Sequence, residues 1–238
     1  MNNVNIKTVG SIVADDYRNA SVFKKYGIDF CCNGNKTLDE VCELKNIEKQ
    51  IILDELEKIT QYDSNDNQNF KNWPLDLLTD YIEKKHHRYV TEKTPLIIEY
   101  LEKICSVHGK QHPELFKIKK LFQESAVELA AHMKKEELIL FPYIRKTTKN
   151  NSTPVQRTAF NSVKMPISVM KSEHNKEGER FNEISQLTNN YTPPSDACNT
   201  YKVTYHLLNE FENDLHLHIH LENNILFPGA ILLDGKQD

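Results

Sequence analysis

Two histidine–glutamate pairs recur in the same sequence context. His132 precedes Glu136 by four positions, and His218 precedes Glu222 by the same interval. Both pairs are followed, in one register, by the residues Ile-Leu-Phe-Pro. Residues four apart on an α-helix lie on one face, so each helix would present an imidazole and a carboxylate together.

The helix face that carries each pair is otherwise apolar. A carboxylate buried on such a face is costly unless a charge or a metal ion partners it. Imidazole with carboxylate suits iron or manganese, whereas zinc is less favoured without thiolates or an H-E-x-x-H motif. A single pair would more often be an ordinary hydrogen bond, but repetition in one register favours a metal site. The apolar positions at the 3/4 spacing are Ile118, Phe122, Leu129, Ile139, Leu208, Phe211, Leu215 and Ile225.

The segment 215–221 alternates aliphatic residues with histidine, as a β-strand would. A strand would place His216, His218 and His220 on one face. The helical spacing persists over the longer stretch 208–225, so we favour a helix in which only His218 lies beside Glu222. His216 and His220 are then expected to be exposed or to lie behind the ligands.

A third helix offers His174 as a further ligand. His174 shares a helical face with Met170 and Phe181. Gly178, one turn later, would allow a neighbouring segment to approach closely. Glu173 is either an outer base beside the site or, as is commoner for such residues, a solvated surface carboxylate.

A fourth helix contains the adjacent pair His86 and His87. At most one of two neighbouring residues is expected to point inwards, and periodicity slightly favours His86. His108 and His112 flank a glycine-containing turn and are expected to be exposed.

Helices must position these residues, because the 238-residue chain contains only 7 glycines and many Lys/Glu/Leu-rich stretches. We predict an all-α protein whose residues 73–238 form an up-down four-helix bundle. The expected long helices cover roughly 75–105, 113–145, 166–190 and 197–227.

A small helical domain should precede the bundle over residues 1–62, with amphipathic segments at 9–17, 20–26 and 38–59. The polar, turn-rich segment 63–72 is predicted to be a linker.

Prolines and a polar stretch mark the expected helix ends. Pro113 and Pro166 fit first-turn positions, whereas Pro142 and Pro228 fit the ends of helices. The polar stretch 146–162 is expected to be a mobile loop.

The composition excludes several classes of protein. A formal net charge of -4 argues against nucleic-acid binding, which needs a basic face. Neither a signal peptide nor an apolar stretch long enough to cross a membrane is found, so we expect a cytoplasmic protein without a membrane partner.

Five cysteines, odd in number and without C-x-x-C spacing, indicate neither a disulfide framework nor a zinc ribbon. Cys31 and Cys32 are adjacent, just before an Asn-Gly turn, and cannot easily form an unstrained disulfide with each other. They are either ordinary thiols or functional ones. The others, Cys42, Cys105 and Cys198, are expected to be structural.

Several segments together resemble one known family, the di-iron iron–sulfur cluster repair proteins (repair of iron centres), whose fold is a hemerythrin-like bundle behind a small Cys-Cys module. The resemblance covers nearly the whole chain. The matching segments are Tyr26-Gly-Ile-Asp-Phe-Cys-Cys-Asn-Gly34, His132-Met-Lys-Lys-Glu-Glu-Leu-Ile-Leu-Phe-Pro142, Pro166-Ile-Ser-Val-Met-Lys-Ser-Glu-His174, Thr192-Pro-Pro-x-x-Ala-Cys198 and Leu221-Glu-Asn-Asn-Ile-Leu-Phe-Pro228.

The resemblance implies two non-haem iron ions and a set of six ligands. The distance of the first ligand from Trp73-Pro74-Leu75 favours His87 over His86, against the periodicity. The implied ligands are His87, His132, His174 and His218, with Glu136 and Glu222 as bridging carboxylates.

The resemblance also implies a function, the repair of iron–sulfur clusters damaged by nitrosative or oxidative stress. Its clients would be damaged iron–sulfur proteins. The iron would serve as a releasable source, as a redox centre that reacts with nitric oxide, or both. The alternatives are a hemerythrin-like carrier or sensor of oxygen or nitric oxide without turnover, and a structural protein with packed histidines. For Cys31 and Cys32, the resemblance is compatible with a redox, iron-handling or homodimer-contact role.

Overall fold

A computed structural model describes residues 7–61, 69–149 and 162–235 of the chain. These parts are helical and contain no β-strand; a single isolated bridge joins Thr8 to Thr37. The predicted all-α class is confirmed. No helix in the described parts combines the length and apolarity needed to cross a membrane.

Short helices form the N-terminal module: α1 (Val9–Asp15), α2 (Ala20–Lys25), α3 (Leu38–Lys45) and α4 (Lys49–Gln61), with a 3-10 turn at Tyr17–Asn19. Thr37 and Glu40 form a capping box that starts α3. Asn46, in the left-handed conformation with φ 52°, ends it. The expected single segment 38–59 is therefore two helices, because Asn tolerates the left-handed turn that breaks them.

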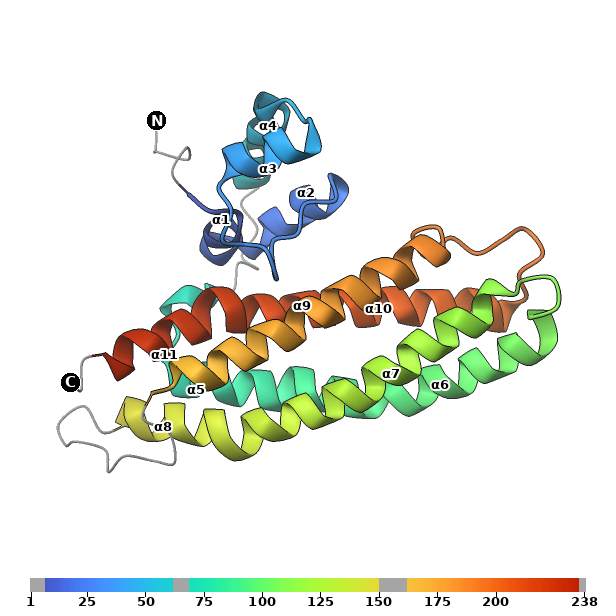
Figure 1. The fold of residues 1–238 in the computed structure, drawn as a ribbon. Helices are drawn as coiled ribbons and strands as arrows, with labels where there is room; N and C mark the ends of the chain where they lie inside the picture. The colour runs from blue at the N-terminus through green and yellow to red at the C-terminus, as the bar shows by residue number, and fades with distance from the viewer. Residues whose placement is uncertain (1–6, 62–68, 150–161, 236–238) are drawn as a thin grey trace.

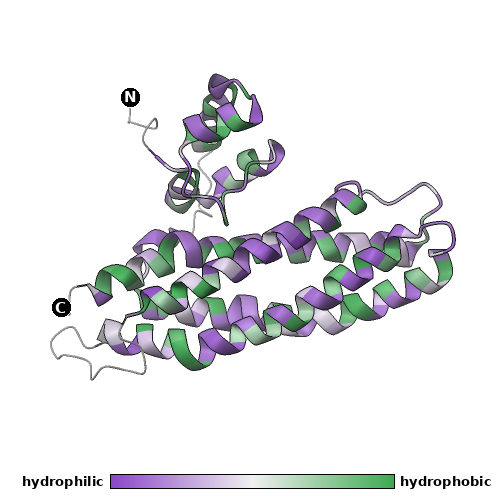
Figure 2. Ribbon diagram, in the orientation of Figure 1, coloured by the Kyte–Doolittle hydropathy of each residue, from purple (hydrophilic) through white to green (hydrophobic). Residues whose placement is uncertain are grey.

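Long antiparallel helices form the bundle, running up and down in chain order (Figure 1). Apolar and polar residues alternate along each of them, as amphipathic helices with one buried face require (Figure 2). α6 packs against α7 and α10, and α7 packs against α9. The elements are α5 (Leu75–Tyr81), α6 (Arg88–His108), α7 (Glu114–Lys135), α8 (Phe141–Lys149), α9 (Lys164–Leu187), α10 (Asn199–Leu221) and α11 (Phe227–Asp234).

Wider π-helical turns join these elements into continuous runs, at Ile82–His87, Glu136–Leu140 and Glu222–Leu226. The sequence predicted that Pro142 and Pro228 end helices, and this prediction is wrong. Each is the second residue of the helix that follows a π turn, where a missing N–H is tolerated. A π turn inside an α-helix often marks a functional site, and each of these turns contains a residue of the candidate site.

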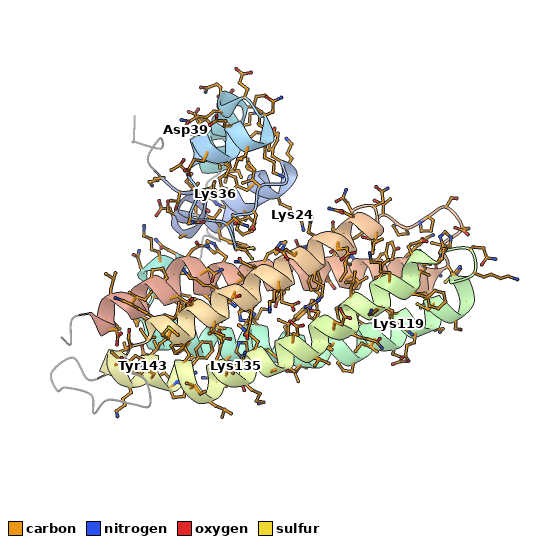
Figure 3. The ribbon with its side chains drawn as sticks, in the orientation of Figure 1. Lys24, Lys36, Asp39, Lys119, Lys135 and Tyr143 are labelled. Carbon is orange, nitrogen blue, oxygen red and sulfur yellow. The ribbon has the colours of Figure 1, made fainter. Side chains whose placement is uncertain are left out.

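The N-terminal module lies against the side of the bundle formed by α9 and α10 (Figure 1). Asn224 donates a hydrogen bond to the carbonyl of Phe30 at 3.1 Å. Lys24, at the module edge that faces the bundle, pairs with Glu212 at 3.1 Å (Figure 3). Gly10 and Gly34 pack so closely beside Asn224 that neither position has room for a side chain.

The connecting segments are only partly described. Most of the predicted linker, residues 63–68, lies outside the described residues, whereas Phe70–Asn72 form a 3-10 turn. Phe70 is buried and packs its ring against Trp73 and Tyr81. Residues 146–149, expected in a loop, continue α8, and 150–161 of that loop lie outside the described residues.

Candidate metal centre

The repeated His–Glu pairs meet inside the bundle. His132 and Glu136 come from the run α7–α8, and His218 and Glu222 from the run α10–α11. His174 joins them from α9, and His87 from the π turn before α6. All six side chains are buried, with residue exposures of 3% or less. Their ligand atoms form two overlapping groups that share both glutamates: His87 and His218 complete one, and His132 and His174 the other.

The Nε2 atoms of the four imidazoles all face the carboxylates. His132 and His87 place Nε2 3.4 Å from the same oxygen of Glu136. His218 and His174 place Nε2 3.0 and 3.1 Å from the two oxygens of Glu222. One carboxylate therefore lies between each pair of rings, which is the arrangement a bridging ligand needs.

Several buried atoms of this cluster have no hydrogen-bond partner of adequate geometry. Among the described residues these include both oxygens of Glu136, one oxygen of Glu222 and Nε2 of His87. Buried polar atoms normally have partners. The Nε2 atoms of His132 and His174 also lie 3.0 Å apart, a contact between two potential ligand lone pairs. Unpartnered carboxylate oxygens and converging imidazoles fit cations at the centre of the group.

The electrostatics of the cluster also favour positive charge. Burial and the Glu222 carboxylate oppose ionisation of Glu136, but the imidazoles of His132 and His87 outweigh them and lower its pKa. The pKa of Glu222 is lowered well below its ordinary value, where His218 and His174 outweigh burial. Burial opposes protonation of His132, yet Glu136 raises its pKa to about 10. Two ionised carboxylates in an apolar core thus attract protons or metal cations.

The Nδ1 atoms of the same rings face outwards to different partners. His87 Nδ1 lies 3.0 Å from Glu137, and His132 Nδ1 lies 2.8 Å from Glu173. Such hydrogen bonds fix the ring and raise its basicity when Nε2 binds a metal. Glu173 is thus an outer partner of the site, one of its two expected roles.

The Nδ1 atoms of the other two imidazoles have no carboxylate partner. His174 Nδ1 donates to the side-chain oxygen of Asn223 at 3.0 Å. His218 Nδ1 is buried and has no hydrogen-bond partner among the described residues. Each half of the cluster therefore combines one carboxylate-supported imidazole with one that lacks such support.

Both members of the pair His86 and His87 are buried, at 0% and 2% exposure. The expectation that at most one would point inwards is wrong, because the π turn Ile82–His87 departs from the α-helical period on which it rested. His87 joins the cluster, contrary to the weak preference of periodicity for His86. His86 lies behind it, with Nδ1 3.0 Å from Asp214 and its ring stacked on His218.

Comparisons with known proteins assign the two parts of the chain to known domains. The profile of the hemerythrin HHE cation binding domain matches residues 79–230, and that of ScdA_N, a domain of unknown function (DUF542), matches residues 5–60. The chain is 31% identical to the iron-sulfur cluster repair protein ScdA of Staphylococcus haemolyticus (strain JCSC1435) over 223 residues, which is 94% of this chain and 97% of the relative. It is 34% identical to the iron-sulfur cluster repair protein YtfE of Escherichia coli O8 (strain IAI1) over 223 residues, 94% of this chain and 96% of the relative.

The chain belongs to the iron–sulfur cluster repair family. The resemblance inferred from the sequence motifs is confirmed. The bundle is the family's hemerythrin-like, cation-binding part, and the buried His/Glu cluster lies within the segment that this description covers.

His216 and His220 do not join the cluster of this family member. Neither is exposed: His220 is 1% exposed, and its ring packs against Tyr17 and Phe30 of the N-terminal module. Burial lowers the pKa of His220 to about 3 and also lowers that of His216, so burial favours the neutral form of both rings. The histidine-rich tract thus faces the module on one side and supplies His218 to the site on the other.

Cys31 and Cys32 are free thiols where the module contacts the bundle. Their Sγ atoms lie 3.8 Å apart, and Cys32 Sγ lies 3.4 Å from the backbone carbonyl of His174. Asn223 connects the two regions, because it donates to the carbonyl of Cys31 at 3.0 Å while accepting from His174. The remaining described cysteines lie apart from both; Cys42 and Cys105 are buried and Cys198 is exposed.

Sequence reasoning missed two outer partners, Glu137 and Asn223. Each directly follows a cluster glutamate, at the same register of the repeat, and each supports a histidine from a neighbouring helix. A polar residue at this register in both motifs was the available signal.

Proposed function

We propose that this chain binds two non-haem iron ions at the His/Glu cluster and takes part in the repair of iron–sulfur clusters damaged by nitrosative or oxidative stress. The observation that carries the proposal is the convergence of six buried ligand side chains whose carboxylate oxygens lack protein partners. The repair function is inferred from the relatives, which are iron-sulfur cluster repair proteins. The clients would be damaged iron–sulfur proteins of the cytoplasm.

In this proposal each residue has a defined role. His87 and His218 would hold one ion, and His132 and His174 the other. Glu136 and Glu222 would bridge the two, since both belong to each half of the cluster. Iron, when bound, would supply coordination positions left open for small diatomic molecules, and a store of ferrous iron.

The protein around the cluster excludes water and holds the imidazoles in place. Phe141 and Phe227 stack on His87 and His174 at ring-centroid distances of 5.6 and 5.9 Å. Both phenylalanines belong to the Ile-Leu-Phe-Pro segments of the repeat, which explains why that segment accompanies each His–Glu pair. A dry, rigid site of this kind keeps its ligands preorganised.

The repair function is tested by reactivation. A [4Fe–4S] dehydratase inactivated with nitric oxide is incubated without oxygen with the iron-loaded protein. We expect recovery of activity with the wild type and little with Glu222→Ala, whereas Glu210→Ala, which alters an exposed glutamate on the same run of helix, should behave as wild type. Recovery no better than with an equal amount of free ferrous iron would contradict the proposal.

Diatomic ligands are the second part of the proposal. Nitric oxide added to the reduced protein without oxygen should react at the cluster. Release of nitrous oxide over many turnovers would indicate an enzyme, and a stable adduct would indicate a stoichiometric role. The Cys-Cys loop contacts both the helix that carries His174 and the π turn that carries Glu222, which favours repair over a simple carrier. No change in the absorption spectrum on adding nitric oxide would contradict this part.

A further inference from the structure

The Cys-Cys loop of the N-terminal module brings three metal-ligating groups together outside the bundle cluster. The side-chain ligand atoms of Asp29, Cys31 and Cys32 all lie within 4.8 Å of one another. Cys31 Sγ donates to Asp29 Oδ1 at 3.3 Å, so the thiol proton lies between two atoms that a cation could join. Thiolates with a carboxylate suit a divalent ion of borderline softness.

The loop is fixed before any ligand arrives. Asp29 accepts backbone hydrogen bonds from Cys31 and Cys32 at 3.0 and 2.9 Å, and a third from Asn33 at 3.2 Å. These bonds fix the loop around the carboxylate. Burial raises the pKa of Asp29, but the side chain of Asn33, the backbone N–H of Cys32 and the thiol of Cys31 outweigh burial and lower it. The ionised carboxylate favours a cation at this position. The hydrogen bond with Cys32, burial and Asp29 raise the pKa of the Cys31 thiol, so a bound cation would have to displace its proton.

Solvent reaches the loop through a cleft of about 510 Å³ between the module and the helices α9 and α10. Cys31, Cys32 and Asp29 line one side of the cleft, and Gly178 of α9 lines the other. A side-chain carbon at position 178 would lie 3.1 Å from Cys32 Sγ, so glycine is what allows the thiol to lie directly on the helix. The close approach expected of this glycine is thus with a thiol.

The Cys-Cys loop lies directly beside the residues of the bundle cluster. Cys32 Sγ lies 3.4 Å from the carbonyl of His174, whose ring belongs to the cluster. Asn223 joins the carbonyl of Cys31 to the ring of His174. The three-donor group thus lies immediately outside the helix turn that carries a candidate iron ligand.

We propose that Asp29, Cys31 and Cys32 form a second metal site, which holds a single ferrous ion in the cleft while it moves to or from the bundle. We call this transient holding of iron the staging role. The staging role rests on the proposed function, but the existence of the metal site does not. Binding is a ligand exchange without redox change: both thiols lose a proton to solvent, and water or a client ligand in the cleft fills the remaining positions. With only three protein donors, the site is suited to transient occupancy.

The test uses cobalt(II), because thiolate ligation gives it an intense sulfur-to-metal absorption that imidazole and carboxylate do not. Reduced, iron-loaded protein is titrated with cobalt(II) under anaerobic conditions. We expect this absorption to appear at about one ion per chain, to vanish in Cys31→Ser/Cys32→Ser, and to persist in Cys198→Ser, which alters an exposed cysteine elsewhere. Asp29→Asn should weaken the affinity about tenfold or more.

A second measurement tests the staging role. The metal-free wild type and Cys32→Ser, whose single change affects only the half-buried thiol, are mixed with ferrous iron. We expect the variant to fill its bundle several-fold more slowly but to the same final iron content.

Absence of the sulfur-to-cobalt absorption in the wild type, or its survival in the double variant, would overturn the site. Equal filling rates would overturn the staging role. A bundle that holds no iron would contradict the proposed function instead, and the cobalt titration would still decide the thiol site.

Discussion

The four imidazoles of the cluster differ in the hydrogen-bond partner of Nδ1, the nitrogen that faces away from the two glutamates. Glu137 and Glu173 support His87 and His132, the amide of Asn223 supports His174, and His218 has no hydrogen-bond partner for that atom among the described residues. A carboxylate partner makes an imidazole a stronger ligand than an amide does. Each half of the cluster therefore contains one strong and one weaker imidazole ligand, which would suit the iron release that the proposed function includes.

Substitution of Glu173 tests this difference. Glu173→Gln keeps the shape but removes the charge behind His132, and it also releases Lys135, which pairs with Glu173 on the bundle surface (Figure 3). We expect iron affinity to fall about 10–100-fold, measured by competition with a chelator. Glu92→Gln, on an exposed part of α6, is the matched control and should leave the affinity unchanged. An unchanged affinity in Glu173→Gln would show that the outer hydrogen bond does not tune the site.

Spacing in the sequence was sufficient to find most of the cluster. The His–Glu repeat located four side chains, and the helical face of Met170 and Phe181 located His174. Between His86 and His87 the periodicity favoured the wrong residue, because the π turn Ile82–His87 changes the period at the site. The residue types of this segment did not indicate a π turn, so the choice between the two histidines needed the three-dimensional structure.

A partly exposed histidine links two connections between helices of the bundle. His112, in the turn between α6 and α7, lies 3.1 Å from both Glu114 and Asp196, the latter in the connection between α9 and α10. The hydrogen bond to Asp196 raises the pKa of His112, and Glu114 adds to the effect against burial. A histidine whose pKa is raised in the folded state stabilises the folded protein. This contribution is complete below the pKa of the unfolded chain, near 6.5, and is lost as the pH rises through the pKa of the folded state.

His112→Gln should therefore lower the free energy of unfolding near about pH 6 by less than about 1 kcal/mol and leave it unchanged near about pH 9. Urea unfolding at the two pH values measures the difference. A loss of equal size at both would show that His112 acts through packing, not charge.

The fold brings the N-terminal module and the bundle into contact. Burial of His220 beneath Tyr17 and Phe30 could not be read from the helix pattern, because it depends on where the module docks. The same docking places Cys31 beside Asn223, far away in the sequence. The sequence predicted both units, whereas their contact is a property of the assembled molecule.

Gly34 tests the importance of docking. A side-chain carbon there would meet the carbonyl of Phe30 at 2.4 Å, the Cα of Gly10 at 2.9 Å and the side chain of Asn224 at 3.0 Å. Gly34→Ala should destabilise the protein by about 1–3 kcal/mol and increase the reaction of Cys32 with a thiol reagent. Gly235→Ala, whose nearest neighbour lies at 3.6 Å, is the control. Unchanged thiol reactivity in Gly34→Ala would contradict the docking account.

The proposed function requires the six buried side chains to form an iron centre, so the iron content of the protein is the decisive quantity. The protein is purified without oxygen, loaded with ferrous iron, freed of unbound metal and analysed for all transition metals. We expect about two iron ions per chain in the wild type and in Glu210→Ala, and less than one in Glu222→Ala. Fewer than about one iron in the wild type with no other metal, or an undiminished content in Glu222→Ala, would contradict the account.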